Sequence, residues 1–185
     1  MKKHLPVLFI AVALLAVAMY QVLDTKQSQS ADETKPSLGL MNNQTSGNPS
    51  LTEDIKQLRN YLLAHPDDAD HWIQLGNLLF DNGNFSEAIK PYAEALRLKP
   101  ENPDVRTDRG VCLFNMGQDE AAIAEFEKSL QYNPNHVTAT FNLGIVHARM
   151  GHTQLAAHYW KKTITLSPDS EMGKKAARAL AEARN

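Results

Sequence analysis

Residues 71–100 read HWIQLGNLLFDNGNFSEAIKPYAEALRLKP, and the marks of this stretch recur along the chain at a constant step of 34 residues. Gly76 is followed at that step by Gly110 and Gly144. Four further columns keep the same register: Gly83, Gly117 and Gly151; Ala88, Ala122 and Ala156; Tyr92, Phe126 and Trp160; Pro100, Pro134 and Pro168. Because 34 residues is the length of a helix–turn–helix unit, the sequence predicts a stacked array of such units.

Each unit carries two apolar stripes with the spacing of helices. In the first unit Trp72, Leu75, Gly76 and Leu79 follow one another at i, i+3, i+4 and i+7, which is typical of one helix face. The turn signal Asp-Asn-Gly-Asn at 81–84 follows, and a second stripe runs from Ala88 to Leu96. The small residues Gly76 and Ala88 are expected to let the paired helices approach closely.

The combined pattern resembles the tetratricopeptide repeat, abbreviated TPR. Residues 69–102 form the first copy, and residues 103–136 and 137–170 resemble a second and a third. The residues that carry the resemblance in the first copy are Trp72, Leu75, Gly76, Leu79, Gly83, Phe85, Ala88, Tyr92, Ala95 and Pro100. The resemblance implies an all-α fold, an α-solenoid of three TPR helix–turn–helix repeats with flanking helices. Its family binds many unrelated partners, so the fold alone does not name one.

Two flanking helices are expected beside the three repeats. Residues 51–65 carry apolar side chains at helical spacing and stop at Pro66, which indicates the second helix of a degenerate leading repeat or an N-terminal cap. Residues 171–184 are expected to form the polar-faced capping helix that a solenoid needs for solubility. Its basic residues are Lys174, Lys175, Arg178 and Arg184. The TPR domain therefore spans residues 51–185.

The N-terminal segment is predicted to direct the chain to a membrane. Lys2 and Lys3 precede an apolar run that continues to Leu23, just long enough to span a bilayer as a helix. Residues 1–23 are therefore a membrane anchor or, with Ala16-Val17-Ala18 as a cleavage site, a signal peptide. Residues 24–50 are polar, lack aromatic side chains and are expected to be a flexible linker. We expect a single-pass protein of the bacterial inner membrane with its TPR domain in the periplasm.

Composition argues against nucleic-acid binding and against catalysis. The net charge of −2 is close to neutral, and both signs are mixed along the chain. The single cysteine, Cys112, excludes an intrachain disulfide and is interpreted as a small core residue. His147, His152 and His158 lack the spacing of a metal site and are expected on the surface. No phosphate-binding loop is present, so no enzyme, metal or cofactor is predicted.

The second repeat departs from the pattern at two positions that normally carry apolar side chains. Arg106 replaces the first aromatic residue, and Arg109 replaces the leucine before the glycine. A buried arginine needs a charged partner. We therefore expect the aliphatic stem of Arg109 to be buried and its head to reach a nearby carboxylate.

The resemblance implies that the first helix of each repeat lines the concave face, where a peptide would bind. Aromatic anchors and asparagine amides suit an extended or helical segment of another protein, although some of these side chains could instead pack between repeats. Lysine is missing from the positions at which some TPR proteins clamp a terminal carboxylate, so that clamp is not predicted. The candidate residues are Ile73, Asn77, Phe80, Thr107, Asp108, Val111, Phe114, Asn115, Phe141, Asn142, Ile145 and Arg149.

The sequence therefore predicts a non-enzymatic adaptor or assembly factor of the bacterial cell envelope. Its partners would be a protein or peptide segment of unknown identity and the membrane, through the N-terminal helix. One alternative is a self-associating scaffold, in which the basic capping helix meets the acidic end at Asp67, Asp68 and Asp70. A second, by similarity of architecture, is a subunit that holds apocytochrome during cytochrome c maturation. A third is a secreted binding module that has lost its anchor.

Overall fold

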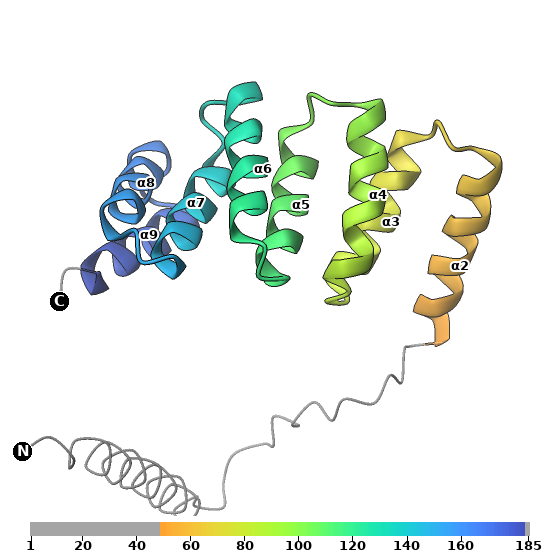
Figure 1. The fold of residues 1–185 in the computed structure, drawn as a ribbon, viewed down its shortest axis with the longest axis horizontal. Helices are drawn as coiled ribbons and strands as arrows, with labels where there is room; N and C mark the ends of the chain where they lie inside the picture. Colours follow the sequence, from red (N-terminus) through yellow and green to blue (C-terminus); the bar gives the residue numbers. More distant parts are fainter. Residues whose placement is uncertain (1–48, 184–185) are drawn as a thin grey trace, which may run out of the picture. The chain divides into compact units, whose positions relative to one another are not determined.

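The computed structural model describes residues 49–183, and every regular element in that range is a helix. This confirms the predicted all-α solenoid, whose helices follow one another in chain order (Figure 1). The predicted anchor, residues 1–23, and residues 24–48 of the predicted linker lie outside the described residues. The bounds are α2 Pro49–Ala64, α3 Ala69–Asp81, α4 Phe85–Leu98, α5 Pro103–Asn115, α6 Asp119–Tyr132, α7 Val137–Arg149, α8 Thr153–Leu166 and α9 Glu171–Glu182.

The first helix of every unit begins one step of 34 residues after the one before it. The starts of α3, α5, α7 and α9 are residues 69, 103, 137 and 171. The residue before each start caps the helix with a side chain that accepts a bond from the backbone N–H three positions on. These four caps are Asp68, Asn102, His136 and Ser170. The capping positions form a further 34-residue column, which the sequence pattern did not single out.

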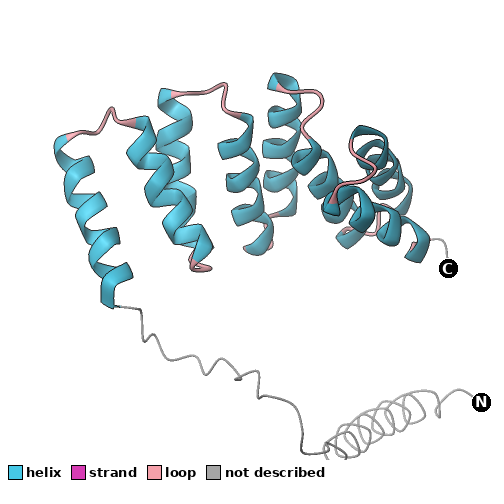
Figure 2. Cartoon of the chain, turned by 180° about the vertical axis from the view of Figure 1, so that it is seen from behind, coloured by secondary structure: helices cyan, strands magenta, loops and turns pink. Residues whose placement is uncertain are grey.

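The second helices begin after a glycine turn. Gly83, Gly117 and Gly151 have φ values of 73°, 72° and 78°, which glycine adopts without strain. Short loops then join each pair of helices, as seen from the opposite side in Figure 2. α2 begins at Pro49, two residues before the predicted domain start, because proline is well suited to the first turn of a helix.

Within each pair, the helices touch where glycine faces an aromatic ring. A β-carbon placed on Gly76 would lie 2.5 Å from the ring of Tyr92, and one on Gly110 would lie 2.5 Å from the ring of Phe126. The predicted close approach is therefore confirmed. Three buried clusters of apolar side chains follow along the array, centred on Tyr92, Phe126 and Trp160.

Cys112 is buried in the first of these clusters, as its interpretation as a core residue requires. Burial raises the pKa of its thiol to about 12. Within residues 49–183, no helix is both long and apolar enough to cross a bilayer.

Candidate functional site

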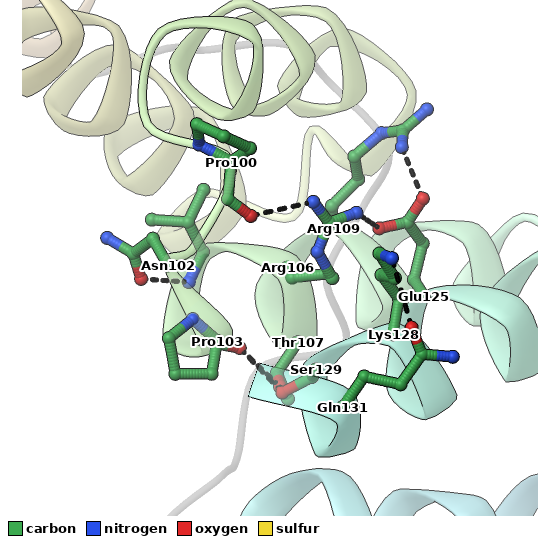
Figure 3. A network of polar contacts seen from close by, with 11 residues as sticks. Pro100, Asn102, Pro103, Arg106, Thr107, Arg109, Glu125, Lys128, Ser129 and Gln131 are labelled. Carbon is green, nitrogen blue, oxygen red and sulfur yellow. Dashed lines mark hydrogen bonds and ion pairs between the residues drawn. The ribbon is translucent and has the colours of Figure 1, made fainter. Parts of the chain in front are cut away.

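The predicted peptide-binding residues lie on α3, α5 and α7, and all but one keep some exposure to solvent. Thr107 is the exception and must be removed from the set. Its hydroxyl donates to the carbonyl oxygen of Pro103 at 2.8 Å and meets the hydroxyl of Ser129 at 3.0 Å (Figure 3). The bond to α6 turns Thr107 into the interior of its own repeat, where no peptide can reach it.

The aromatic candidates are partly exposed and partly engaged in packing. Phe80 meets Phe85 edge to face, with ring centroids 5.5 Å apart. Phe141 is half-buried against the third core cluster. Both rings are half-buried in packing contacts, so each leaves only part of its surface open to a ligand.

Arg149 covers Phe114 and joins three helices. Its guanidinium carbon lies 3.3 Å from the centroid of the Phe114 ring, and its Nη2 donates to the Phe114 carbonyl oxygen at 2.8 Å. Its Nε also donates to Oδ2 of Asp119 at 3.1 Å. Because its charge is already paired, Arg149 is a fixed edge of the surface rather than a free cation.

The asparagines differ in how much of each amide is free. The carbonyl oxygen of the Asn77 side chain accepts a bond from the Tyr92 hydroxyl at 2.9 Å. Asn115 donates to the backbone carbonyl of Val111 at 2.9 Å. Asn142 is half-buried and makes no side-chain hydrogen bond within residues 49–183, so its amide has no competing partner in that range.

Asp108 is a half-buried carboxylate on α5 with no ion pair within the described range. Burial, with a further contribution from Asp104, raises its pKa to about 6. Asp104 is itself engaged, because one of its oxygens lies 2.8 Å from Nε2 of His136. The surface therefore carries an unpartnered acidic group between α3 and α7.

A groove of about 660 Å³ lies between α2 and α3, next to the predicted surface, and was not predicted. Asn77 is the one candidate residue that reaches it. On its rim, the Tyr61 ring lies 4.4 Å from that of His65 and 4.2 Å from that of His71, between centroids. The lining residues are Asp54, Gln57, Leu58, Tyr61, His71, Gln74, Asn77, Leu78 and Asp81.

The two arginines of the second repeat share one carboxylate. Arg109 Nη1 lies 2.5 Å from one oxygen of Glu125, and Arg106 Nη1 lies 3.0 Å from the other (Figure 3). The predicted carboxylate partner of Arg109 is therefore confirmed. The residues equivalent to Glu125 are Pro91 in the first repeat and Tyr159 in the third. Among the three repeats, this charged group of two arginines and one glutamate is therefore confined to the second.

His147 is buried, which corrects the expectation that its ring is exposed, whereas His152 and His158 are exposed as expected; His136 is buried as well. His136 caps α7, and His147 stacks on Tyr159 with ring centroids 5.5 Å apart. His147 Nδ1 lies 3.3 Å from Nδ1 of His152, although their spacing in the sequence suggested no common face. Burial lowers the pKa of His147. Among the residues that the structure describes, no group of three or more potential ligands could hold a metal ion.

Comparisons with known proteins agree with this fold. The family described as "Cytochrome c-type biogenesis protein H TPR domain" matches residues 12–173. Among solved structures, the chain is similar to the crystal structure of MamA protein, with 21% identity over 73% of this chain and 74% of that chain and a TM-score of 0.67. No curated protein shows a significant match.

Two further structures share the fold. The first TPR of Spaghetti (RPAP3) bound to the HSP90 peptide SRMEEVD has 21% identity, covers 63% of this chain and 92% of that chain, and gives a TM-score of 0.58. The Arabidopsis OM64 TPR domain has 18% identity, covers 62% and 94%, and gives a TM-score of 0.58. At such identities these structures establish the fold alone.

The TPR fold indicates a protein–protein interaction adaptor, a class of scaffold that is generally non-enzymatic. The family match covers residues 12–173 of the chain and includes all three repeats. This chain therefore belongs to the family of the cytochrome c-type biogenesis protein H TPR domain.

Proposed function

We propose that this protein is an assembly factor of the bacterial cell envelope that serves cytochrome c maturation. It holds a segment of a partner polypeptide against the side chains of α3, α5 and α7. The observation that carries the proposal is the family match over residues 12–173, which joins the TPR array to cytochrome c biogenesis. The partner class we propose is an unfolded apocytochrome, held before its haem is attached.

The chemistry of the surface supports a polypeptide ligand. Phe141 and Ile145 lie one helical turn apart on α7, and each is half-buried, so both can cover an apolar side chain of the partner. The free amide of Asn142 can bond the main chain of an extended segment. A surface of this kind recognises a segment by its shape and backbone, which suits a protein that has not yet folded.

We propose the same cellular location that the sequence predicts. Residues 1–23 would hold the protein in the inner membrane, and the TPR domain would lie in the periplasm. The apolar run and the preceding lysines support this arrangement. Fractionation of cells that express the full chain, together with protease treatment of spheroplasts, tests it. A TPR domain found in the cytoplasmic fraction would show that the location is wrong.

The binding proposal is tested with the full chain in detergent and haem-free cytochrome c as the probe. Phe141→Ala combined with Asn142→Ala should weaken binding at least tenfold, because it removes an apolar contact and the free amide. The matched control is Leu155→Ala combined with Gln154→Ala, two exposed residues of α8 on the other helix of the same repeat. Circular dichroism should show equal helix content in both variants. Equal binding by both variants would contradict the proposed surface.

A further inference from the structure

The described array begins and ends with half a repeat. α2 has the register of a second helix, and no first helix precedes it within the described residues. α9 has the register of a first helix, and no second helix follows it up to residue 183. A solenoid repeat buries its apolar face only against its neighbours, so each end presents a surface that another helix would cover.

The groove between α2 and α3 is the open place of a first helix. Among its α3 residues, His71 and Leu78 have Val105 and Cys112 as their equivalents one repeat later. Val105 is 4% exposed and Cys112 is 0% exposed, because both pack in the core cluster formed with α3 and α4. The same face of α3 borders a groove of about 660 Å³ that no described helix fills.

The unpaired charge in this groove is negative. Asp54 and Asp81 line it, and neither has an ion pair within residues 49–183. The acidic residues that the sequence suggested for end-to-end stacking each have a partner within their own chain, so Asp54 and Asp81 are the unpaired carboxylates at this end of the described range. Asp67 pairs with Arg97 at 3.7 Å, Asp68 with His71 at 2.8 Å and Asp70 with Lys99 at 2.7 Å.

The free face of α9 has the opposite charge. Its exposed residues Lys174, Ala177, Arg178 and Ala181 occupy the positions of Trp72, Leu75, Gly76 and Leu79, which face the second helix in the first repeat. Arg178 has no ion pair within the described range, and Lys174 has only a loose contact to Glu171 at 3.6 Å. A helix with this face carries positive charge toward any second helix that meets it.

The repeat register shows which groups would meet. Gly76 faces Tyr92, and the α2 residues equivalent to Tyr92 and Ala88 are Leu58 and Asp54. A helix with Arg178 in place of that glycine would face Leu58, and the long arginine side chain can reach Asp54 one helical turn away. Arginine is too large for the close approach that glycine allows, so this contact would be held by charge rather than by tight packing.

We propose that the groove between α2 and α3 binds α9 of a second copy of this chain, head to tail, with Arg178 of one copy paired to Asp54 of the next. Two half repeats then make one complete repeat. Such a contact leaves one groove and one α9 free, so it extends into short linear chains of copies. One helix in one groove is a small interface, and we expect a dissociation constant on the order of 10–100 μM that rises with salt.

Charge exchange tests the pairing in the full chain, by sedimentation equilibrium in density-matched detergent. Asp54→Arg and Arg178→Asp each place like charges together, so each variant alone should associate at least tenfold more weakly. Mixing the two variants, or combining both changes in one chain, should restore association. Glu120→Arg and Lys161→Asp are matched controls on exposed positions of α6 and α8 and should change nothing.

Disulfide trapping tests the geometry. Asp54→Cys combined with Arg178→Cys should give a ladder of covalent dimers, trimers and larger species on a non-reducing gel. A wild-type chain that stays monomeric up to 500 μM, or association that both charge variants leave unchanged, would overturn the proposal. A second variant combines Asp54→Cys with Met41→Cys. An intramolecular disulfide in that variant would also overturn the proposal, because the chain's own preceding segment would then occupy the groove.

Discussion

Arg106 donates a hydrogen bond to the carbonyl oxygen of Pro100 at 3.0 Å, which is the bond that Trp72 makes to Pro66 one repeat earlier at 2.8 Å. The guanidinium thus replaces the indole as the donor that ties the first helix to the preceding loop. Unlike the indole, it brings a charge into a site where its side chain is only 12% exposed. Glu125, which is 15% exposed, supplies the balancing charge for Arg106 and Arg109 together.

Removal of Glu125 is expected to destabilise the array. Glu125→Ala leaves two largely buried guanidinium groups without a counter-charge and should lower the free energy of unfolding by about 2–3 kcal/mol, somewhat less than for a fully buried pair. Urea denaturation of the full chain, followed by circular dichroism, measures the change. Glu127→Ala, an exposed carboxylate on the same helix, is the control and should stay within about 0.5 kcal/mol of the wild type. An equal effect of both changes would show that the shared carboxylate has no special role.

Replacing the whole charged group by apolar residues should not destabilise the array. The combined change Arg106→Trp, Arg109→Leu and Glu125→Tyr installs the residues found at these positions in the first and third repeats. Buried ion pairs lose much of their attraction to desolvation, so well-packed apolar substitutes are often neutral or stabilising. The triple variant should unfold at the same or a higher urea concentration than the wild type. A loss comparable to that of Glu125→Ala would mean that the charges are needed for packing in this repeat.

The contact between Gly110 and Phe126 makes a further prediction. A β-carbon on Gly110 would lie 2.5 Å from the Phe126 ring, so Gly110→Ala should destabilise by about 1–3 kcal/mol through overpacking. The second change Phe126→Leu makes room for the methyl group. The double variant should therefore lose less stability than the sum of the two single losses, as measured by a double-mutant cycle on urea denaturation. Simple additivity would contradict the steric explanation.

The sequence predicted these helix pairs because the residues that define them act locally. Gly83 sets the turn of the first repeat, and Gly76 must fit against Tyr92. The equivalent residues meet the same two requirements in the other repeats, so the period is visible without coordinates. The burial of Thr107 could not be predicted in this way. It depends on the Ser129 hydroxyl that the packed α6 brings to it, whereas threonine side chains are mostly exposed in proteins.

The groove between α2 and α3 escaped prediction for a different reason. Sequence patterns mark helices that are present, whereas this groove reflects a first helix that the described range lacks. Its α3 residues His71 and Leu78 look like any positions of an exposed face. Only the burial of their equivalents, Val105 and Cys112, shows that this face is normally covered.

The raised pKa of Asp108 predicts an unusual pH dependence of stability. Its folded pKa of about 6 lies above the ordinary value near 4, so the folded state binds the proton more tightly than the unfolded state. The favourable contribution of the Asp108 carboxyl to the free energy of unfolding is therefore complete below about pH 4. It is lost as the pH rises to about 6. Asp108→Asn removes this loss and should stabilise the protein by roughly 1–2 kcal/mol at pH 7, after allowance for partial solvent exposure.

Urea denaturation of the full chain at pH 4.5 and pH 7 tests this prediction. The gain from Asp108→Asn should be present at pH 7 and mostly absent at pH 4.5, where the wild-type carboxyl is already protonated. Asp169→Asn, an exposed carboxylate in the loop before α9, is the control and should behave like the wild type at both pH values. A gain of equal size at both pH values would mean that Asp108 acts through its shape rather than its charge.

His136 is an unusual helix cap, and its bonds fix which ring nitrogen carries the proton. Nδ1 accepts a bond from the backbone N–H of Ala139 at 3.1 Å, so a neutral ring carries its hydrogen on Nε2, which lies 2.8 Å from Asp104. The ring thus caps α7 and reaches the first turn of α5. His136→Ala removes both contacts and should cost about 1–2 kcal/mol, which urea denaturation measures. His136→Asn restores the kind of cap that Asn102 provides one repeat earlier and should recover most of that loss. If asparagine recovers nothing, the contact with Asp104 rather than the cap is what stabilises this junction.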